Sequence, residues 1–160
     1  MKLLIFTEGT ILMHKNAFGH TREEIVQQVK VGEQSVHEYE SYVPIGGAVE
    51  KLKNWQAQGL EIVYLTSRKS ETEINNIQSV LDKYNFPKCN LEYRRENEQY
   101  NDVAERILPD ILIEDDCESI VGVPEMTITH VKQDIKDKIK SVPILEFGGI
   151  DHLASDFLDL

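Results

Sequence analysis

Polar clusters follow three apolar runs of this chain, and their residue types suit phosphate and metal chemistry. Glu8 closes the first run, Thr66 and Ser67 follow the second, and Asp115 and Asp116 follow the third. Hydroxyl and backbone N–H groups at the start of a helix can bind phosphate oxygens. Carboxylates are hard oxygen ligands that suit Mg²⁺. The apolar runs are Leu3–Phe6, Ile62–Leu65 and Ile111–Ile113.

Continuous apolar runs of this length are typical of buried parallel strands. In open α/β sheets, ligands bind just beyond the carboxyl ends of such strands. We therefore expect the three polar clusters to meet at one edge of a sheet. Glu8 is expected at the mouth of that site.

Helical patterns alternate with the apolar runs, which predicts an α/β fold with a three-layer, doubly wound, mostly parallel sheet. At 160 residues the chain is predicted to form a single domain, residues 1–160. A polar insertion, residues 11–42, follows the first strand and contains a helix that starts at a capping box of Thr21 and Glu24. The tail from Asp151 is expected to fray. Helices are predicted at 44–58, 70–84, 101–107 and 133–140, and further strands at 91–93, 126–131 and 142–147.

Composition limits the possible partners. The chain has 17 basic and 28 acidic side chains, a net charge of −11, which argues against nucleic-acid binding. No apolar run approaches the roughly 20 residues of a membrane span. Cys89 and Cys117 are expected to be reduced thiols, which together with the absence of a signal-peptide pattern predicts a cytoplasmic location. The oligomeric state is not indicated.

The order of these clusters resembles the haloacid dehalogenase (HAD) superfamily over roughly residues 1–131. Its first motif is an apolar strand followed by Asp-x-Asp-Gly-Thr, in which the first Asp is the phosphoryl-accepting nucleophile and the second is a general acid. Aligned on Gly9 and Thr10, this chain has Phe6 in the position of the nucleophile and Glu8 in that of the acid. A phenyl ring cannot accept a phosphoryl group. In residues 11–42 the resemblance implies a flap or small cap over the site.

The resemblance also implies roles for the later clusters. Thr66 would bind phosphate and Asp115, with Asp116, would hold Mg²⁺. The family lysine that steadies the phosphate has no counterpart between Lys88 and Asp116, and Asn101 and two arginines are the nearest replacements. We therefore predict phosphate binding by Thr66, Ser67, Arg94 and Arg95, metal binding by Glu8, Asp115 and Asp116, and Glu8 as the candidate catalytic residue.

Three functions are compatible with these residues. The first is a HAD-like protein that binds Mg²⁺ and a small phosphorylated ligand but lacks phosphoaspartyl catalysis, because that route needs a carboxylate where Phe6 stands. The second is a divergent Mg²⁺-dependent phosphomonoester hydrolase that uses Glu8. The third is a protein-interaction module without a small-molecule site. The same residues can also have a purely structural role, without any ligand. Glu8 would then be a turn residue, and Asp115 and Asp116 would cap a short helix.

Overall fold

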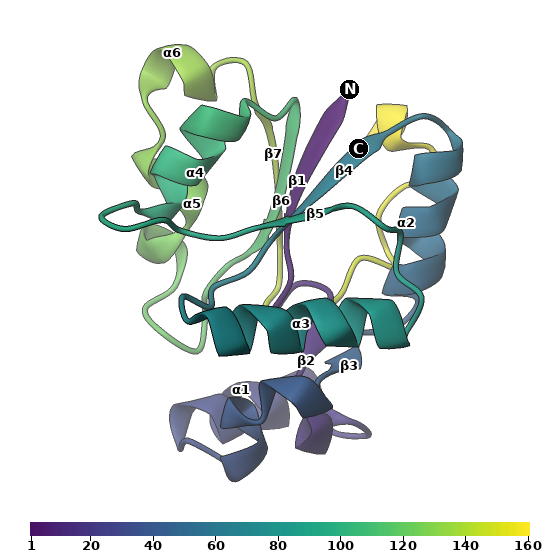
Figure 1. Cartoon of the computed structure of the whole chain (residues 1–160), viewed down its shortest axis with the longest axis vertical. Helices are drawn as coiled ribbons and strands as arrows, with labels where there is room; N and C mark the ends of the chain where they lie inside the picture. Colours follow the sequence, from purple (N-terminus) through teal and green to yellow (C-terminus); the bar gives the residue numbers. More distant parts are fainter.

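Five parallel strands form the sheet that positions the polar clusters (Figure 1). The computed structural model describes residues 1–160, and the strand order is β5-β4-β1-β6-β7. The chain adds strands first on one side of β1 and then on the other, which is the doubly wound α/β topology predicted from the sequence. The strands are β1 (Lys2–Phe6), β4 (Glu61–Leu65), β5 (Asn90–Glu92), β6 (Ile111–Asp115) and β7 (Lys140–Ile144).

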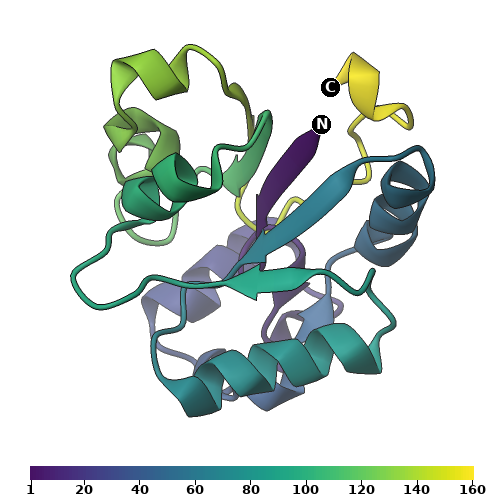
Figure 2. The same cartoon turned by 45° about the horizontal axis from the view of Figure 1, so that its top comes forward.

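Helices cover both faces of this sheet, because alternate side chains of each strand point to opposite sides. On one face, Leu3 and Ile5 of β1 pack in a core cluster with residues of α2 and α3. On the other face, Leu4 and Phe6 pack with residues of α4, and side chains of α5 and α6 adjoin them. Figure 2 shows α4, α5 and α6 on the opposite side of the sheet from α2. The helices are α2 (Ala48–Ala57), α3 (Glu71–Lys83), α4 (Tyr100–Ile107), α5 (Thr127–His130) and α6 (Gln133–Lys136).

The helix predicted to start at Ser70 begins where its cap is found. The backbone N–H of Glu73 donates to the Ser70 hydroxyl at the start of α3, at 3.3 Å, as the sequence pattern predicts. The longer predicted helix at 44–58 begins only at Ala48, because Val43–Pro44 forms a short strand. The helix predicted at 133–140 ends at Lys136, and the strand predicted at 142–147 is β7, which ends at Ile144.

None of the helices combines the length and the apolar character required to cross a membrane.

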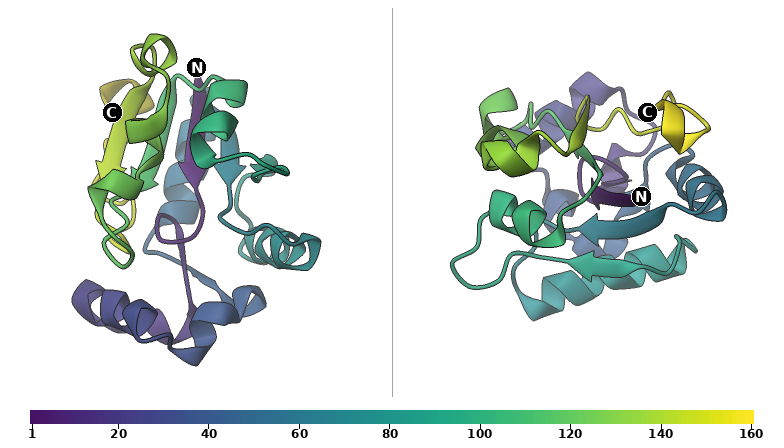
Figure 3. Two further views of the ribbon diagram at one scale, coloured as in Figure 1. Left: turned by 90° about the vertical axis from the view of Figure 1, so that its left-hand side faces the viewer. Right: turned by 90° about the horizontal axis from the view of Figure 1, so that it is seen from above.

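The insertion lies beyond the carboxyl ends of the strands (Figures 1 and 3). Two short strands, β2 (Leu12–Met13) and β3 (Val43–Pro44), pair antiparallel and connect it to the sheet domain. Its only α-helix, α1 (Arg22–Lys30), starts at the capping box formed by Thr21 and Glu24. Three 3-10 helices complete it, at Lys15–Ala17, Gln34–His37 and Tyr39–Ser41.

The strand predicted at 126–131 is wrong. This segment is the short helix α5, and β7 takes the place beside β6. The reason is a contact distant in sequence: the buried Glu114 carboxylate accepts hydrogen bonds from the backbone N–H groups of Thr127 and Ile128, at 2.7 and 2.9 Å. A carboxylate at this position satisfies N–H groups of the first helical turn.

The prediction that the tail frays from Asp151 is also wrong. The tail packs along α2, where the indole N–H of Trp55 donates to the carbonyl of Ala154 at 3.1 Å and the ammonium of Lys51 donates to the carbonyl of Leu153 at 2.6 Å. Phe157 is buried in the main core cluster with an exposed fraction of 8%. The tail therefore closes one end of the core.

The Phe157→Ala substitution tests this docking. We expect a loss of about 3 kcal/mol in the free energy of unfolding, because a large buried side chain is replaced by a cavity. The matched control is the neighbouring Leu158→Ala, whose side chain is 65% exposed and whose loss we expect to stay within about 0.5 kcal/mol. Denaturant unfolding of the two variants measures both values. Equal effects of the two substitutions would contradict a docked tail.

Candidate functional site

A tight turn directly after β1 places Glu8 at the centre of the sheet edge. The backbone N–H of Thr7 donates to the carbonyl of Leu65, which extends the pairing of β1 with β4 by one residue. The N–H groups of Ile11 and Leu12 both donate to the carbonyl of Thr7. Gly9 has a φ of +80°, and a Cβ there would come within 2.7 Å of an Asp115 side-chain oxygen. Gly9 is thus required by the turn, since only glycine combines this conformation with such a close approach.

The Glu8 carboxylate is the point on which the donors of the site converge. Its Oε1 accepts from the hydroxyl of Thr66 at 2.8 Å, the hydroxyl of Ser67 at 3.2 Å and the Arg68 Nε at 3.2 Å. Its Oε2 accepts from the backbone N–H of Ser67 at 3.3 Å and from the Thr7 hydroxyl. The structure therefore brings together Glu8, Thr66 and Ser67, and it places the predicted phosphate-binding donors on the protein's own carboxylate. We call Thr66, Ser67 and Arg68 the Glu8 cradle.

Arg68 was not among the residues predicted for the site. It forms an ion pair with Glu8, its side chain is 25% exposed, and its guanidinium lies over the ring of Tyr39 at 4.4 Å from the centroid. One guanidinium nitrogen also donates to the Tyr39 hydroxyl. Because Tyr39 belongs to the insertion, Arg68 connects the strand ends to that insertion. Its position next to Thr66 and Ser67, immediately after a buried strand, is the signal in the sequence that could have identified it.

Asp115 lies beside this cluster, at the end of β6. Its two carboxylate oxygens accept from the backbone N–H of Cys117 at 3.0 Å and the hydroxyl of Thr10 at 3.1 Å. Burial raises the pKa of Asp115 to about 6, since desolvation disfavours the charged carboxylate. Burial also raises the pKa of the nearby Glu146, and Asp115 adds to that effect. Glu146 was not predicted from the sequence.

The predicted metal ligands do not form a metal site. No group of three or more His, Cys, Asp or Glu side chains is arranged to hold an ion. The oxygens of Glu8 and Asp115 accept hydrogen bonds from the protein's own donors, and Asp116 Oδ1 accepts from the backbone N–H of Glu146 at 3.1 Å. Because these carboxylates are held by separate partners and are not gathered around one point, the residues as arranged do not fit Mg²⁺.

Phe6, in the position of the family nucleophile, packs into the core. Its exposed fraction is 9%, and its ring meets that of Tyr100 edge-on at 5.2 Å between centroids. This contact is a favourable aromatic geometry. The position of the family nucleophile is therefore taken by a phenyl ring that packs on a second aromatic ring.

The structure separates the two arginines that were predicted to bind phosphate. Arg94 donates to the Ser67 carbonyl at 3.3 Å, and its guanidinium lies 4.0 Å from the centroid of the Tyr100 ring. Arg95 is exposed, and its backbone N–H donates to Glu98. Neither side chain has a hydrogen bond to Glu8, so Arg68 is the arginine of the Glu8 cradle.

A cavity of 280 Å³ lies between the strand ends and the insertion. Glu8, Ser67, Arg68 and Asp115 line it from the sheet, and the insertion contributes aromatic and apolar side chains together with two histidines. This volume is close to the lower limit for small-molecule sites. The insertion residues of the lining are His14, Val29, Val36, His37, Tyr39 and Tyr42.

Comparisons with known proteins support the fold. No family model and no curated protein sequence matches the chain. One chain of the Pnkp1/Rnl/Hen1 RNA repair complex aligns with 91% of this chain at 13% identity and a TM-score of 0.55, and the matched part is 42% of that chain. This chain thus spans less than half the length of that relative. The D,D-heptose 1,7-bisphosphate phosphatase from Burkholderia Thailandensis aligns with 88% of this chain and 90% of its own length, at 9% identity and a TM-score of 0.47.

The likeness to the RNA repair complex supports the doubly wound α/β fold. At this level of identity it concerns the fold alone. The second similarity is too low to support an argument. Neither carries an activity or a ligand over to this chain.

The pH dependence of stability tests the surroundings of Asp115. A raised pKa means that Asp115 binds more protons in the folded protein than in the unfolded chain, so the stability that this carboxyl contributes is fully present below its unfolded pKa and is lost as pH rises through the folded value, about 6. We expect the difference in free energy of unfolding between wild type and Asp115→Asn to move against wild type by about 2 to 3 kcal/mol from roughly pH 4 to pH 7. Urea unfolding at several pH values measures it. A difference that stays constant with pH would refute the assignment.

Proposed function

We propose that this HAD-like protein binds a small phosphorylated ligand in the cavity above the strand ends and does not turn it over through a phosphoaspartate. One observation carries the proposal: two hydroxyl groups, a backbone N–H and a guanidinium converge on a single carboxylate. Such a set of donors is suited to an anion with several oxygens. Glu8 is the anion in the present structure.

A phosphate group can take the place of the Glu8 carboxylate. It presents the same type of acceptor, and Arg68 can bind it with its planar fork of donors. The exchange requires Glu8 to leave the donors, because two anions at one guanidinium repel each other. Glu8 would thus weaken phosphate binding in the resting protein. The 280 Å³ cavity next to it has room for a small ligand and is bounded by aromatic side chains.

The absence of phosphoaspartyl turnover rests on Phe6 and on the state of Glu8. Phe6 cannot act as a nucleophile, and its ring is fixed against Tyr100. Glu8 is the other carboxylate at the end of β1, and both of its oxygens accept hydrogen bonds from the cradle and from Thr7. A carboxylate held in this way is a poor nucleophile and a poor base, because attack would cost several of these contacts. We therefore favour binding over hydrolysis by Glu8.

We further propose that this binding does not require Mg²⁺. The predicted ligands Glu8, Asp115 and Asp116 accept hydrogen bonds from the chain and are not gathered into a group that could hold an ion. Arg68 supplies the positive charge that a metal would otherwise provide. Titration with Mg²⁺ alone, and with phosphate in the presence and absence of Mg²⁺, checks this part separately, and a large gain in phosphate affinity with Mg²⁺ would overturn it.

The Glu8→Ala substitution tests the central claim. Removing the internal carboxylate frees the donors and removes a like charge, so we expect inorganic phosphate to bind at least about tenfold more tightly, a change of about 1.4 kcal/mol. Calorimetric titration measures the affinity. Phosphate should also raise the melting temperature of Glu8→Ala more than that of wild type, because a ligand of the folded state stabilises it in proportion to its affinity.

Two further variants serve as controls. Glu96→Ala removes the same charge from an exposed position and should leave phosphate affinity within about twofold of wild type. Arg68→Gln should abolish the gain when combined with Glu8→Ala. If phosphate binds neither wild type nor Glu8→Ala, the proposal fails and an interaction module becomes the better account. Turnover of a phosphomonoester panel by wild type, lost in Glu8→Gln, would instead establish the Glu8-dependent hydrolase.

A further inference from the structure

The cavity above the strand ends contains more negative than positive charge. Three carboxyl groups line it, those of Glu8, Asp115 and Glu146, and Arg68 is the only lysine or arginine in its lining. A phosphate that takes the place of Glu8 at Arg68 would therefore enter a cavity with two further acids and no second cation. Like charges repel each other strongly where water is largely excluded. A phosphorylated ligand of this cavity consequently needs a positive charge of its own.

Asp115 and Glu146 meet beside Gly9, the residue that follows Glu8. A Cβ on Gly9 would lie 2.7 Å from Asp115 Oδ2 and 3.5 Å from Glu146 Cγ. The exposed fractions of the two acids are only 8% and 6%, but both line the cavity, so a ligand there can reach them. Each of their four carboxylate oxygens accepts one hydrogen bond from the chain. Because a carboxylate oxygen has two lone pairs, each can accept one more.

His14 adds a third acceptor to this wall. The side-chain nitrogen of Gln28 donates to the Asn16 carbonyl at 3.2 Å, which turns Gln28 Oε1 toward His14 Nε2, at 2.7 Å. Nε2 therefore carries the proton of the neutral imidazole, and Nδ1 is an acceptor. His14 is 1% exposed and lines the cavity. Its Nδ1 is not sealed from solvent, since Arg94 Nε is the only unpartnered side-chain nitrogen or oxygen that is. Nδ1 is thus open to a ligand in the cavity.

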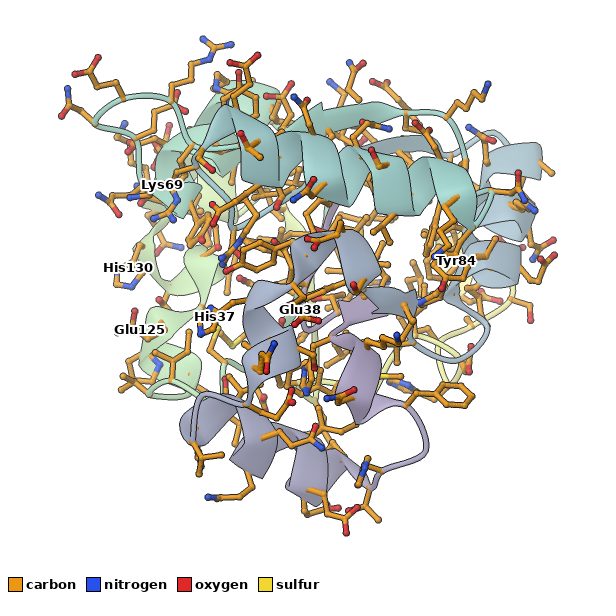
Figure 4. All side chains as sticks on the ribbon, turned by 60° about the horizontal axis from the view of Figure 1, so that its bottom comes forward. His37, Glu38, Lys69, Tyr84, Glu125 and His130 are labelled. Carbon is orange, nitrogen blue, oxygen red and sulfur yellow. The ribbon has the colours of Figure 1, made fainter.

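Much of the remaining lining is apolar, and the insertion contributes a large share of it. Val29, Val36 and Tyr42 of the insertion all line the cavity. Figure 4 shows another lining residue, His37, on the side of the insertion toward His130. An apolar wall favours a hydrocarbon segment in the ligand. The volume of 280 Å³ is small for a ligand site, which restricts that segment to a short chain.

We propose that the ligand of this cavity is a small phosphate monoester that also carries an ammonium group on a short hydrocarbon chain. The phosphate binds at Arg68. The ammonium donates to Asp115, Glu146 and the Nδ1 of His14. A primary ammonium has three N–H donors and no acceptor, which matches these three acceptors, and its charge offsets the two acids. This inference rests on the proposed function and adds the chemical class of the ligand.

Two phosphate monoesters of equal size test the ligand class. 2-Aminoethyl phosphate carries the ammonium, and n-propyl phosphate has a methyl group in its place. We expect wild type and Glu8→Ala to bind 2-aminoethyl phosphate at least about tenfold more tightly than n-propyl phosphate in calorimetric titration. The backbone N–H of Ser119 donates to Glu146 Oε2 at 2.6 Å, so its NMR signal should shift with the first ester and not with the second.

The Glu146→Gln substitution tests the acidic wall. It removes one negative charge and keeps a side-chain oxygen that can accept from Ser119. We expect the preference for 2-aminoethyl phosphate over n-propyl phosphate to fall by about fivefold or more. The matched control is Glu96→Gln, which removes the same charge from an exposed position and should leave the preference within about twofold. If Glu146→Gln does not fold, Asp115→Asn takes its place with the same expected loss.

The outcomes separate this inference from the proposed function. Equal affinities of Glu8→Ala for the two esters, with inorganic phosphate bound, overturn the inference and leave the proposed function intact. Failure of inorganic phosphate and both esters to bind overturns both. A preference that Glu146→Gln and Glu96→Gln weaken equally, or that neither weakens, also overturns the inference, because the ammonium would not be recognised by the cavity wall. A preference lost in Glu146→Gln and kept in Glu96→Gln supports it.

Discussion

The need to satisfy a partly buried carboxylate at the end of β1 organises the functional end of this protein. The Glu8 side chain is 13% exposed, and it obtains partners from its own strand, from the end of β4 and from the guanidinium of Arg68. Each of these contacts compensates for solvation that the carboxylate loses in the fold. The donors after β4 are consequently held in a fixed arrangement before any ligand arrives. The geometry of the anion site and the stability of the strand ends therefore share the same contacts.

Asp115 and Glu146, on the other side of the same cavity, have no positively charged donor. Burial raises the pKa of both Asp115 and Glu146, and the charge of Asp115 raises the pKa of Glu146 further. Their hydrogen bonds come from backbone N–H groups and hydroxyls of Thr10, Cys117 and Ser119, none of which carries a positive charge. The cavity thus has one strongly compensated carboxylate, at Glu8, and two weakly compensated ones. An incoming anion is expected on the side of Arg68.

The sequence predicts the parts of this structure that depend on local patterns. The apolar runs become parallel strands, Thr21 and Glu24 form their capping box, and Ser70 caps α3. The polar clusters that follow the apolar runs correctly predict that Glu8, Thr66 and Ser67 meet at one edge of the sheet. Contacts between distant segments were beyond this reasoning. The segment of α5 alternates between apolar and polar residues like a strand, but the Glu114 carboxylate accepts hydrogen bonds from the N–H groups of its first helical turn. The carbonyls of the tail accept hydrogen bonds from side chains of α2. Glu146 likewise gains its significance only from residues remote in sequence, such as Asp115 and Ser119.

The contact between Arg68 and Tyr39 has a consequence for any mutational study of the insertion. One guanidinium interacts with both the Glu8 carboxylate and the Tyr39 ring, so neither contact has an energy of its own that can be measured by a single substitution. Changes at Tyr39 and at Glu8 should therefore be non-additive, although the two residues lie on separate parts of the fold. For the same reason, a substitution at Tyr39 in the insertion also affects the contact that Arg68 makes with Glu8 after β1. We therefore expect the insertion and the end of β1 to vary together among related sequences.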